Sequence, residues 1–138
     1  MTRLIGFDYG THRIGIAVSD PLKITAQPLL TVNVTVSDKL SDEIKKILKD
    51  IDFDKIIVGL PLNMNGTEGD IAHKARHFAH LLENEYDVPI VLWDERLSSR
   101  SADRVLLEHN MRRRKRKQNK DVLSAVIILQ NYLDYLSG

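Results

Sequence analysis

The sequence FDYGTHRIG, residues 7–15, follows a short apolar run at residues 4–7 and leads directly into a second run at residues 13–19. Both runs have the length of strands, and Gly10-Thr11 supplies the turn between them. Asp8 stands at the end of the first strand, where burying a carboxylate costs free energy. Because Asp is also common in turns, Asp8 is either a turn residue or part of a functional site. The choice depends on which other residues the fold brings to it.

A third strand is expected at residues 28–36, where apolar residues alternate with polar ones at Leu30, Val32, Val34 and Val36. Strict alternation is typical of a strand with one solvated face. Pro28 lacks an amide hydrogen and favours the edge of a sheet. Three closely spaced strands predict an antiparallel meander with the third strand at its edge.

From residue 40 onward, strands alternate with segments whose apolar residues recur at helical spacing. The apolar runs at residues 55–59 and 89–93 predict strands that are buried on both faces. Helices are expected at residues 40–51, at residues 71–82 after a capping box at 67–70, at 99–109 and at 121–136. Strand–helix–strand units pair in parallel, so residues 1–138 are expected to form a single α/β domain with a mixed sheet.

The net charge of +1 hides a strongly basic segment at residues 109–120. This segment contains seven Lys or Arg residues and no acid, which leaves a net charge of −6 on the rest of the chain. It is either a solvated loop or a contact for a polyanion. Because consecutive cations repel each other, a polyanion that neutralises them is favoured, and nucleic acid is the expected partner. Its basic residues are Arg112, Arg113, Arg114, Lys115, Arg116, Lys117 and Lys120.

The chain has no cysteine, which excludes a disulfide, a thiolate zinc site and a cysteine nucleophile. The apolar run before Asp8 is too short for a signal peptide or a membrane span. A cytoplasmic protein is therefore expected.

Acidic residues stand at the ends of three predicted elements, namely Asp8, the pair Asp94-Glu95, and Asp121. Ligands of open α/β sheets bind outside the carboxyl ends of parallel strands, so these acids are expected at one edge of the sheet. Crowded carboxylates repel each other, and a hard divalent cation offsets that repulsion. Each acid also has a structural interpretation, since Asp121 suits a helix N-cap, and Asp94 and Glu95 can simply flank a strand end with Glu95 paired to Arg96 or Arg100. Together with the basic segment, however, they favour a metal-dependent site that hydrolyses phosphodiesters.

Four stretches of the chain read FDYGTHRIGIAV, IIVGLPLNMNGTEG, DERLSS and KDVLSAVIIL. In this order and spacing they resemble the YqgF family, the Holliday-junction-resolvase-like proteins described as pre-16S rRNA nucleases within the RNase H-like superfamily. The resemblance covers essentially the whole chain. It implies an RNase H-like α/β fold, in which helices flank a mixed five-stranded sheet of order 3-2-1-4-5 with strands one, four and five parallel. It further implies that Asp8, Glu95 and Asp121 are catalytic and bind one or two Mg²⁺ or Mn²⁺ ions.

The chain departs from the superfamily at the end of the fourth strand, where junction resolvases carry an acid. That place reads GLPLN here, so Glu95 is expected to take over the role. Asn65 stands where the family commonly has Asp, and Ser99 where Thr is common, which leaves the role of the loop at 63–67 open. The residues expected to support the site are Gly10, Thr11, Asn63 and Thr67.

The resemblance implies a metal-dependent endonuclease that acts on structured nucleic acid, with precursor 16S rRNA in ribosome biogenesis as the expected substrate. Ribosome assembly intermediates are accordingly expected partners. The alternatives are a resolvase of four-way DNA junctions and a protein that binds RNA or DNA without cutting it. The Asp8–Thr11 stretch also fits the phosphate loop of actin-like ATPases, but those proteins clamp nucleotide between two such domains and this chain supplies one.

Two roles are open for Arg96, which is expected either to contact the scissile phosphate or to form a structural ion pair. The basic segment is expected to hold phosphates and position the nucleic acid without reading its bases. Binding through this segment should therefore depend strongly on salt.

Overall fold

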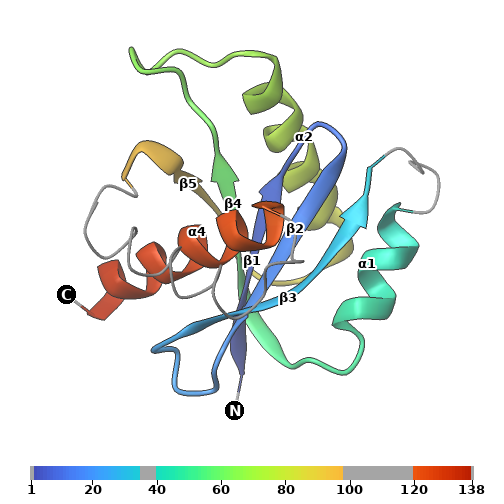
Figure 1. The fold of residues 1–138 in the computed structure, drawn as a ribbon. Helices are drawn as coiled ribbons and strands as arrows, with labels where there is room; N and C mark the ends of the chain where they lie inside the picture. The colour runs from blue at the N-terminus through green and yellow to red at the C-terminus, as the bar shows by residue number, and fades with distance from the viewer. Residues whose placement is uncertain (1, 35–39, 98–119, 138) are drawn as a thin grey trace.

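The computed structural model describes residues 2–34, 40–97 and 120–137, and the side chains of Lys120 and Asp121 lie outside that description. A five-stranded sheet of order β3-β2-β1-β4-β5 forms its centre (Figure 1). The strands are β1 (Arg3–Tyr9), β2 (Arg13–Ser19), β3 (Ala26–Asn33), β4 (Phe53–Leu60) and β5 (Ile90–Asp94). The helices are α1 (Leu40–Leu48), α2 (Asp70–Glu85), the 3-10 turn η2 (Glu95–Leu97) and α4 (Lys120–Ser137). The helix expected at residues 99–109 lies outside the described residues.

The hairpin of β1 and β2 has the predicted antiparallel pairing, with Asp8 opposite Gly15. A 2.9 Å hydrogen bond from the Gly10 backbone N–H to the Arg13 carbonyl oxygen closes its turn. The Gly-Thr turn expected from the sequence is thus confirmed, and Asp8 lies within the strand rather than in the turn itself.

The third strand is the edge strand that Pro28 predicts, but its bounds and its alternation differ from the prediction. β3 begins earlier, at Ala26, and ends at Asn33. Its register against β2 shifts between Ile16 and Ala17, so that one extra residue, Leu29, enters β3. Such a bulge breaks strict alternation. Leu29 therefore packs against the core while Leu30 is 39% exposed.

The second half of the sheet is parallel, as predicted. β4 pairs in parallel with β1 on one side and with β5 on the other, which confirms the order 3-2-1-4-5. β4 ends in a fully buried run, but all residues of β5 are only half-buried. The prediction of a fully buried strand at 89–93 is therefore wrong, because β5 is an edge strand with a neighbour on one side only.

Helices α1 and α2 cover one face of the sheet and α4 covers the other (Figure 1), and each face has its own core. On one face, side chains such as Phe7 and Val58 pack with the apolar sides of α1 and α2. On the other face, Leu4, Ala17 and Ile57 pack with α4, whose residues Val126 and Leu129 are buried. The helix expected at 121–136 is thus confirmed, and most of its residues between Val122 and Leu133 are buried.

Helix α4 lies unusually close to β1 because Gly6 has no side chain. A Cβ atom at Gly6 would come within 2.8 Å of the Leu129 Cβ and 3.5 Å of the Ala125 carbonyl oxygen. Further along α4, the Gln130 side-chain amide accepts a hydrogen bond from the Ala26 backbone N–H, where β3 begins. The second half of α4 thus lies toward the start of β3, and its first turn lies toward the carboxyl ends of β1 and β4.

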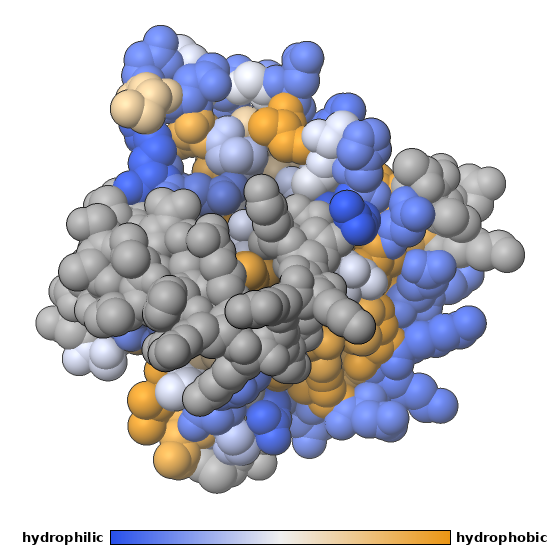
Figure 2. Space-filling model, viewed as in Figure 1, coloured by the Kyte–Doolittle hydropathy of each residue, from blue (hydrophilic) through white to orange (hydrophobic). Residues whose placement is uncertain are grey.

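The surface differs between the two ends of the sheet (Figure 2). Hydrophilic residues dominate the upper part of this view, where the loop between β4 and α2 lies. Hydrophobic residues gather at the lower end, over the turn between β2 and β3, where Leu22 is 66% exposed and Ile24 is 61% exposed. Among the described helices, none combines the length and the apolar character that crossing a bilayer requires.

Candidate active site

Asp8 lies on the α4 side of the sheet, close to the carboxyl end of β1. Gly6 faces Leu129 of α4, and because side chains alternate along a strand, Asp8 faces the same side two residues later. Its side chain is half-buried. Asp8 is thus at the edge that the sequence predicts for a ligand site, on the face that α4 covers.

Glu95 reaches the same face from a different element. It is the first residue of η2, directly after β5, and its side chain extends back over β4. Its Cγ and Cδ atoms both lie 3.3 Å from the position that a Cβ atom of Gly59 would occupy. Its Oε2 atom is shielded from solvent. The carboxyl group of Glu95 therefore occupies the space above Gly59.

The position above Gly59 is next to Asp8. The parallel register pairs Phe7 of β1 with Val58 of β4, so Asp8 and Gly59 are the next residues on two adjacent strands. Neighbouring strands lie about 4.8 Å apart. The structure thus places Asp8 and the Glu95 carboxyl on the same face, one on β1 and the other above β4, although Glu95 follows β5, which is not a neighbour of β1.

Asp121 is the second residue of α4, one helical turn before Ala125. The Ala125 carbonyl oxygen lies over Gly6, and the helix runs from there toward the edge at which Asp8 lies. The side chain of Asp121 is outside the described part of the structure, so its role as a third ligand stays a prediction. Within the described residues, no three His, Cys, Asp or Glu side chains gather closely enough to hold a metal ion.

Arg96 forms an ion pair with Asp94, which is one of the two roles expected for it, while a contact with the scissile phosphate stays a prediction. Its Nη2 atom lies 2.9 Å from Asp94 Oδ2, its Nε atom lies 3.2 Å from each Asp94 oxygen, and its backbone N–H donates to Asp94 Oδ1 at 2.9 Å. Hydrogen bonds from Arg96 hold the pKa of the Asp94 carboxyl below its usual value. The guanidinium also donates to the Met64 carbonyl oxygen at 3.4 Å, which links η2 to the loop after β4.

The loop between β4 and α2 is held by its own polar side chains. Asn63 Nδ2 donates to Thr67 Oγ1 at 3.0 Å, and that hydroxyl donates to Asn65 Oδ1 at 2.6 Å. The Thr67 hydroxyl is therefore engaged inside the loop and does not cap α2, whose N-cap is Gly69 without a side-chain hydrogen bond. The capping box expected at 67–70 is wrong for this reason.

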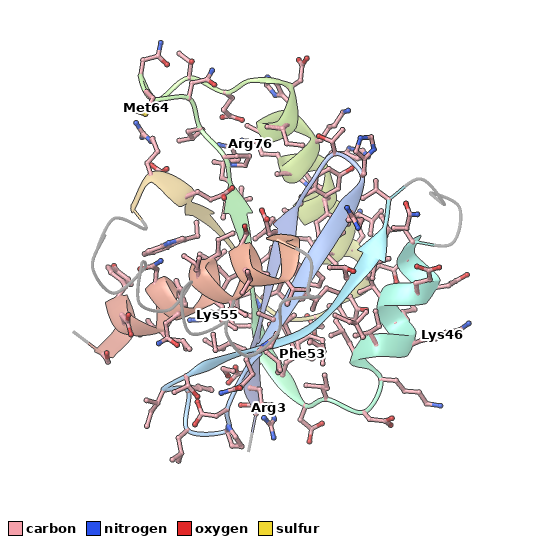
Figure 3. All side chains as sticks on the ribbon, in the orientation of Figure 1. Arg3, Lys46, Phe53, Lys55, Met64 and Arg76 are labelled. Carbon is pink, nitrogen blue, oxygen red and sulfur yellow. The ribbon has the colours of Figure 1, made fainter. Side chains whose placement is uncertain are left out.

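The same loop projects from the edge at which the parallel strands end. Figure 3 shows Met64 at its outer end, away from Arg3 and Phe53 at the opposite end of the sheet. The Met64 side chain is 96% exposed. Asn63 and Thr67 shape this loop, and Gly10 and Thr11 form the neighbouring turn after β1. A direct part of these four residues in a reaction stays a prediction. The basic residues at 112–117 lie outside the described residues.

Gly59 does not stand out as a site residue in the sequence, although it makes room for Glu95. The sequence does hold a signal for Gly59, because an isolated glycine within an apolar strand run often marks a close approach. Asp94 is one of the two acids that the sequence places at the end of the last strand, and the structure shows it as the partner of Arg96. No sequence signal predicts that Asp94 pairs with Arg96 while Glu95 extends over β4.

A family model described as "RuvX: Holliday junction resolvase" matches residues 2–135. The chain belongs to the RuvX family. This result confirms the resemblance to the YqgF family, which is another name for the same group.

Curated relatives of this RuvX chain share the name "Putative pre-16S rRNA nuclease". One from Desulfitobacterium hafniense is 47% identical over 134 residues, which cover 97% of this chain and 93% of that protein. One from Clostridium novyi is 48% identical over 132 residues, which cover 96% of this chain and 98% of that protein. One from Geobacillus is 44% identical over 137 residues, which cover 96% and 97% respectively.

A solved structure described as "T. thermophilus RuvC in complex with Holliday junction substrate" superimposes on the RuvX chain with a TM-score of 0.73. The match covers 99% of this chain and 96% of that one at 12% sequence identity. At this identity the likeness shows the fold alone. It confirms the expected RNase H-like architecture.

Proposed function

We propose that this RuvX chain is a divalent-metal-dependent endonuclease, a single RNase H-like domain over residues 1–138 that processes the 5′ end of precursor 16S rRNA. The observation that carries the proposal is the Glu95 carboxyl above Gly59, beside Asp8 and at the carboxyl edge of the sheet. Family membership supports nuclease chemistry, and the shared name of the curated relatives supports the rRNA substrate.

The residues at this edge fit a hard divalent cation such as Mg²⁺ or Mn²⁺. Carboxylate oxygens are the ligands that these ions prefer. Asp8 and Glu95 approach each other on one face, and a cation between them would offset the repulsion of two half-buried charges. Asp121 would add a third carboxylate from the first turn of α4. One or two such ions would lower the pKa of a water molecule and neutralise charge on the phosphate oxygens.

Basic residues of the chain would bind and orient the nucleic acid. The segment with Arg112, Arg113, Arg114, Lys115, Arg116, Lys117 and Lys120 would hold phosphates on both sides of the cut and so fix the register of the nucleic acid. Arg96 was the one further candidate for a phosphate contact. Because its guanidinium is engaged by Asp94, we assign it to the support of Glu95 instead.

A second candidate function is the resolution of four-way DNA junctions. The matching family and the solved RuvC complex are both described in terms of Holliday junctions. The chemistry at the proposed site would be the same for either polymer. A third possibility, binding of nucleic acid without cleavage, would leave the carboxylates of Asp8 and Glu95 without a catalytic task.

For the rRNA substrate of the leading proposal, ribosome assembly intermediates would be the partners and the cytoplasm the place of action.

The deciding experiment offers precursor 16S rRNA and a four-way DNA junction to the purified protein with Mg²⁺ or Mn²⁺, beside Asp8→Asn. We expect cleavage of the rRNA precursor and a loss of roughly a hundredfold or more in Asp8→Asn, as expected when a metal ligand is removed. Nucleic acid binding by Asp8→Asn should persist. If Asp8→Asn cleaves as fast as the parent protein, the proposed site is wrong. Binding without cleavage by the parent protein would favour the non-catalytic alternative.

A further inference from the structure

Gly59 lies beneath the Glu95 carboxyl in the proposed site, on the strand next to that of Asp8. It belongs to β4, pairs with Trp93 of β5 and is level with Asp8 of β1. Glu95 follows directly after β5, and because β4 lies between β5 and β1, its side chain must extend over β4 for its carboxyl to lie near Asp8. The path of the Glu95 side chain therefore runs directly over Gly59.

Two groups fill the space that a side chain at position 59 would need. A Cβ atom there would lie 2.5 Å from Ile128 Cδ1 and 3.3 Å from both Glu95 Cγ and Glu95 Cδ. The Ile128 contact involves the flexible end of a side chain, which can turn away at modest cost. The Glu95 contact involves the carboxyl carbon itself, and relief of that contact would move the acidic group.

We propose that Gly59 is a positioning residue, which keeps β4 free of a side chain so that the Glu95 carboxyl can lie beside Asp8. The inference rests on the proposed function, because it gives Glu95 its role there. It deepens that function by explaining how an acid from the turn after β5 serves a site on β1, while the end of β4 carries no acid of its own.

A competing explanation is that Gly59 only permits close packing of α4 through Ile128. The two explanations separate because Ile128→Val removes the Cδ1 atom and leaves Glu95 untouched. The double variant Gly59→Ala/Ile128→Val then has room for the new methyl group on the helix side. Only the contact with Glu95 remains.

The experiment compares the parent protein with Ile128→Val, Gly59→Ala/Ile128→Val and Glu95→Gln. For each protein, thermal unfolding without metal, Mn²⁺ affinity by titration calorimetry and Mn²⁺-dependent cleavage of the rRNA precursor are measured. We expect the double variant to unfold close to Ile128→Val but to lose about tenfold to hundredfold in Mn²⁺ affinity, the loss typical of residues that orient metal ligands. Cleavage should fall with the affinity.

The outcomes distinguish this inference from the proposed function. If the double variant binds Mn²⁺ and cleaves like Ile128→Val while Glu95→Gln fails at both, Gly59 has no positioning role and the proposed site stands. If Glu95→Gln cleaves and binds Mn²⁺ like the parent protein, the proposed site and this inference both fall.

A relocated acid gives a second test that does not depend on the stability of the alanine variant. In Gly59→Asp/Glu95→Ala/Ile128→Val, a carboxyl group would start from β4 and enter the space that Glu95 has left. We expect this variant to regain at least part of the Mn²⁺ affinity that Glu95→Ala/Ile128→Val lacks. Equal, weak affinity in the two variants would count against the position above Gly59 as the place where the acid is needed.

Discussion

Arg96 and Asp94, the two residues on either side of Glu95 in the sequence, form an ion pair with Arg96 Nη2 at 2.9 Å from Asp94 Oδ2. The pair and the hydrogen bond from the Arg96 backbone N–H fix the short turn η2, from which Glu95 extends over β4. Because Arg96 Nη1 also contacts the Met64 carbonyl oxygen, one guanidinium joins the turn to the loop after β4. The orientation of Glu95 and the position of that loop are thus coupled.

Replacement of Arg96 should affect the rate of cleavage more than the binding of nucleic acid. We expect Arg96→Gln to lower the rate at saturating substrate, because the turn that carries Glu95 loses its ion pair. The overall stability should change little, since a partly exposed pair contributes about 0–1 kcal/mol. Measurements of kcat, KM and the salt dependence of binding test this prediction.

Asp94→Asn provides the matched variant, because it weakens the same ion pair from the other side and leaves the Arg96 cation in place. The two variants should show similar losses in rate. A salt slope that falls by about one in Arg96→Gln alone would instead indicate a direct contact between Arg96 and a phosphate.

Neutralisation of the basic segment should, in contrast to Arg96→Gln, affect the binding of nucleic acid more than the rate of cleavage. With residues 112–117 changed to Gln, binding should weaken, and on single strands its salt slope should decrease by about 0.7 for each phosphate that the protein no longer neutralises. Single-turnover cleavage at saturating protein concentration should be largely retained. A double variant of Lys46 and Lys49, two exposed lysines on and after α1 on the face of the sheet opposite α4, gives the loss of binding per cation removed at another place (Figure 3 labels Lys46). An equal loss per removed cation in this control would show that the segment makes no specific contribution.

The turn between β2 and β3 should make stability depend on pH. Asp20 accepts hydrogen bonds from the backbone N–H groups of Thr25, Ile24 and Leu22, and these bonds lower its pKa from the usual 3.8. A lowered pKa in the folded state gives a stabilising contribution above the unfolded pKa, which disappears as the pH falls through the folded value. The parent protein should therefore be more stable than Asp20→Asn at neutral pH, and the difference should shrink below about pH 4. Urea unfolding at several pH values measures it, and a difference that is constant with pH would contradict the assignment.

A side chain at Gly6 should push α4 away from the sheet. The added Cβ atom would meet the Leu129 Cβ at 2.8 Å, and neither atom can rotate away. We expect Gly6→Ala to lower the free energy of unfolding by about 1–3 kcal/mol, as is typical of overpacked cores. Gly69→Ala is the control, since its nearest new contact would be 3.8 Å away. Equal stability of Gly6→Ala and the parent protein would show that α4 adjusts without cost.

The strands and their order could be predicted because each depends on a local signal. Residues 7–15 supply two strand ends and a turn, and Pro28 indicates an edge, so the antiparallel half follows from neighbouring residues. The parallel half follows from the alternation of apolar runs with helical spacing. Asp8 at a strand end was visible for the same reason.

The contacts that build the site could not be predicted in the same way. The position of Glu95 above Gly59 depends on the β4–β5 register and on the reach of a side chain across a strand. The position and residue type of Thr67 suit a helix cap, but its hydroxyl donates a hydrogen bond to Asn65 Oδ1 instead. The bulge at Leu29 likewise results from pairing with β2 and not from the sequence of β3 itself.

The empty position on β4 has a consequence for how such a site can change over time. As long as Glu95 supplies the acid, replacement of Gly59 by a residue with a side chain would displace the Glu95 carboxyl group. Under the proposed function, the two positions would therefore have to change together. An acid on the fourth strand would make the glycine unnecessary, and an acid in the turn after the fifth strand would require it. A transition between these two arrangements needs both positions to change, with Ile128 as the neighbour that must yield.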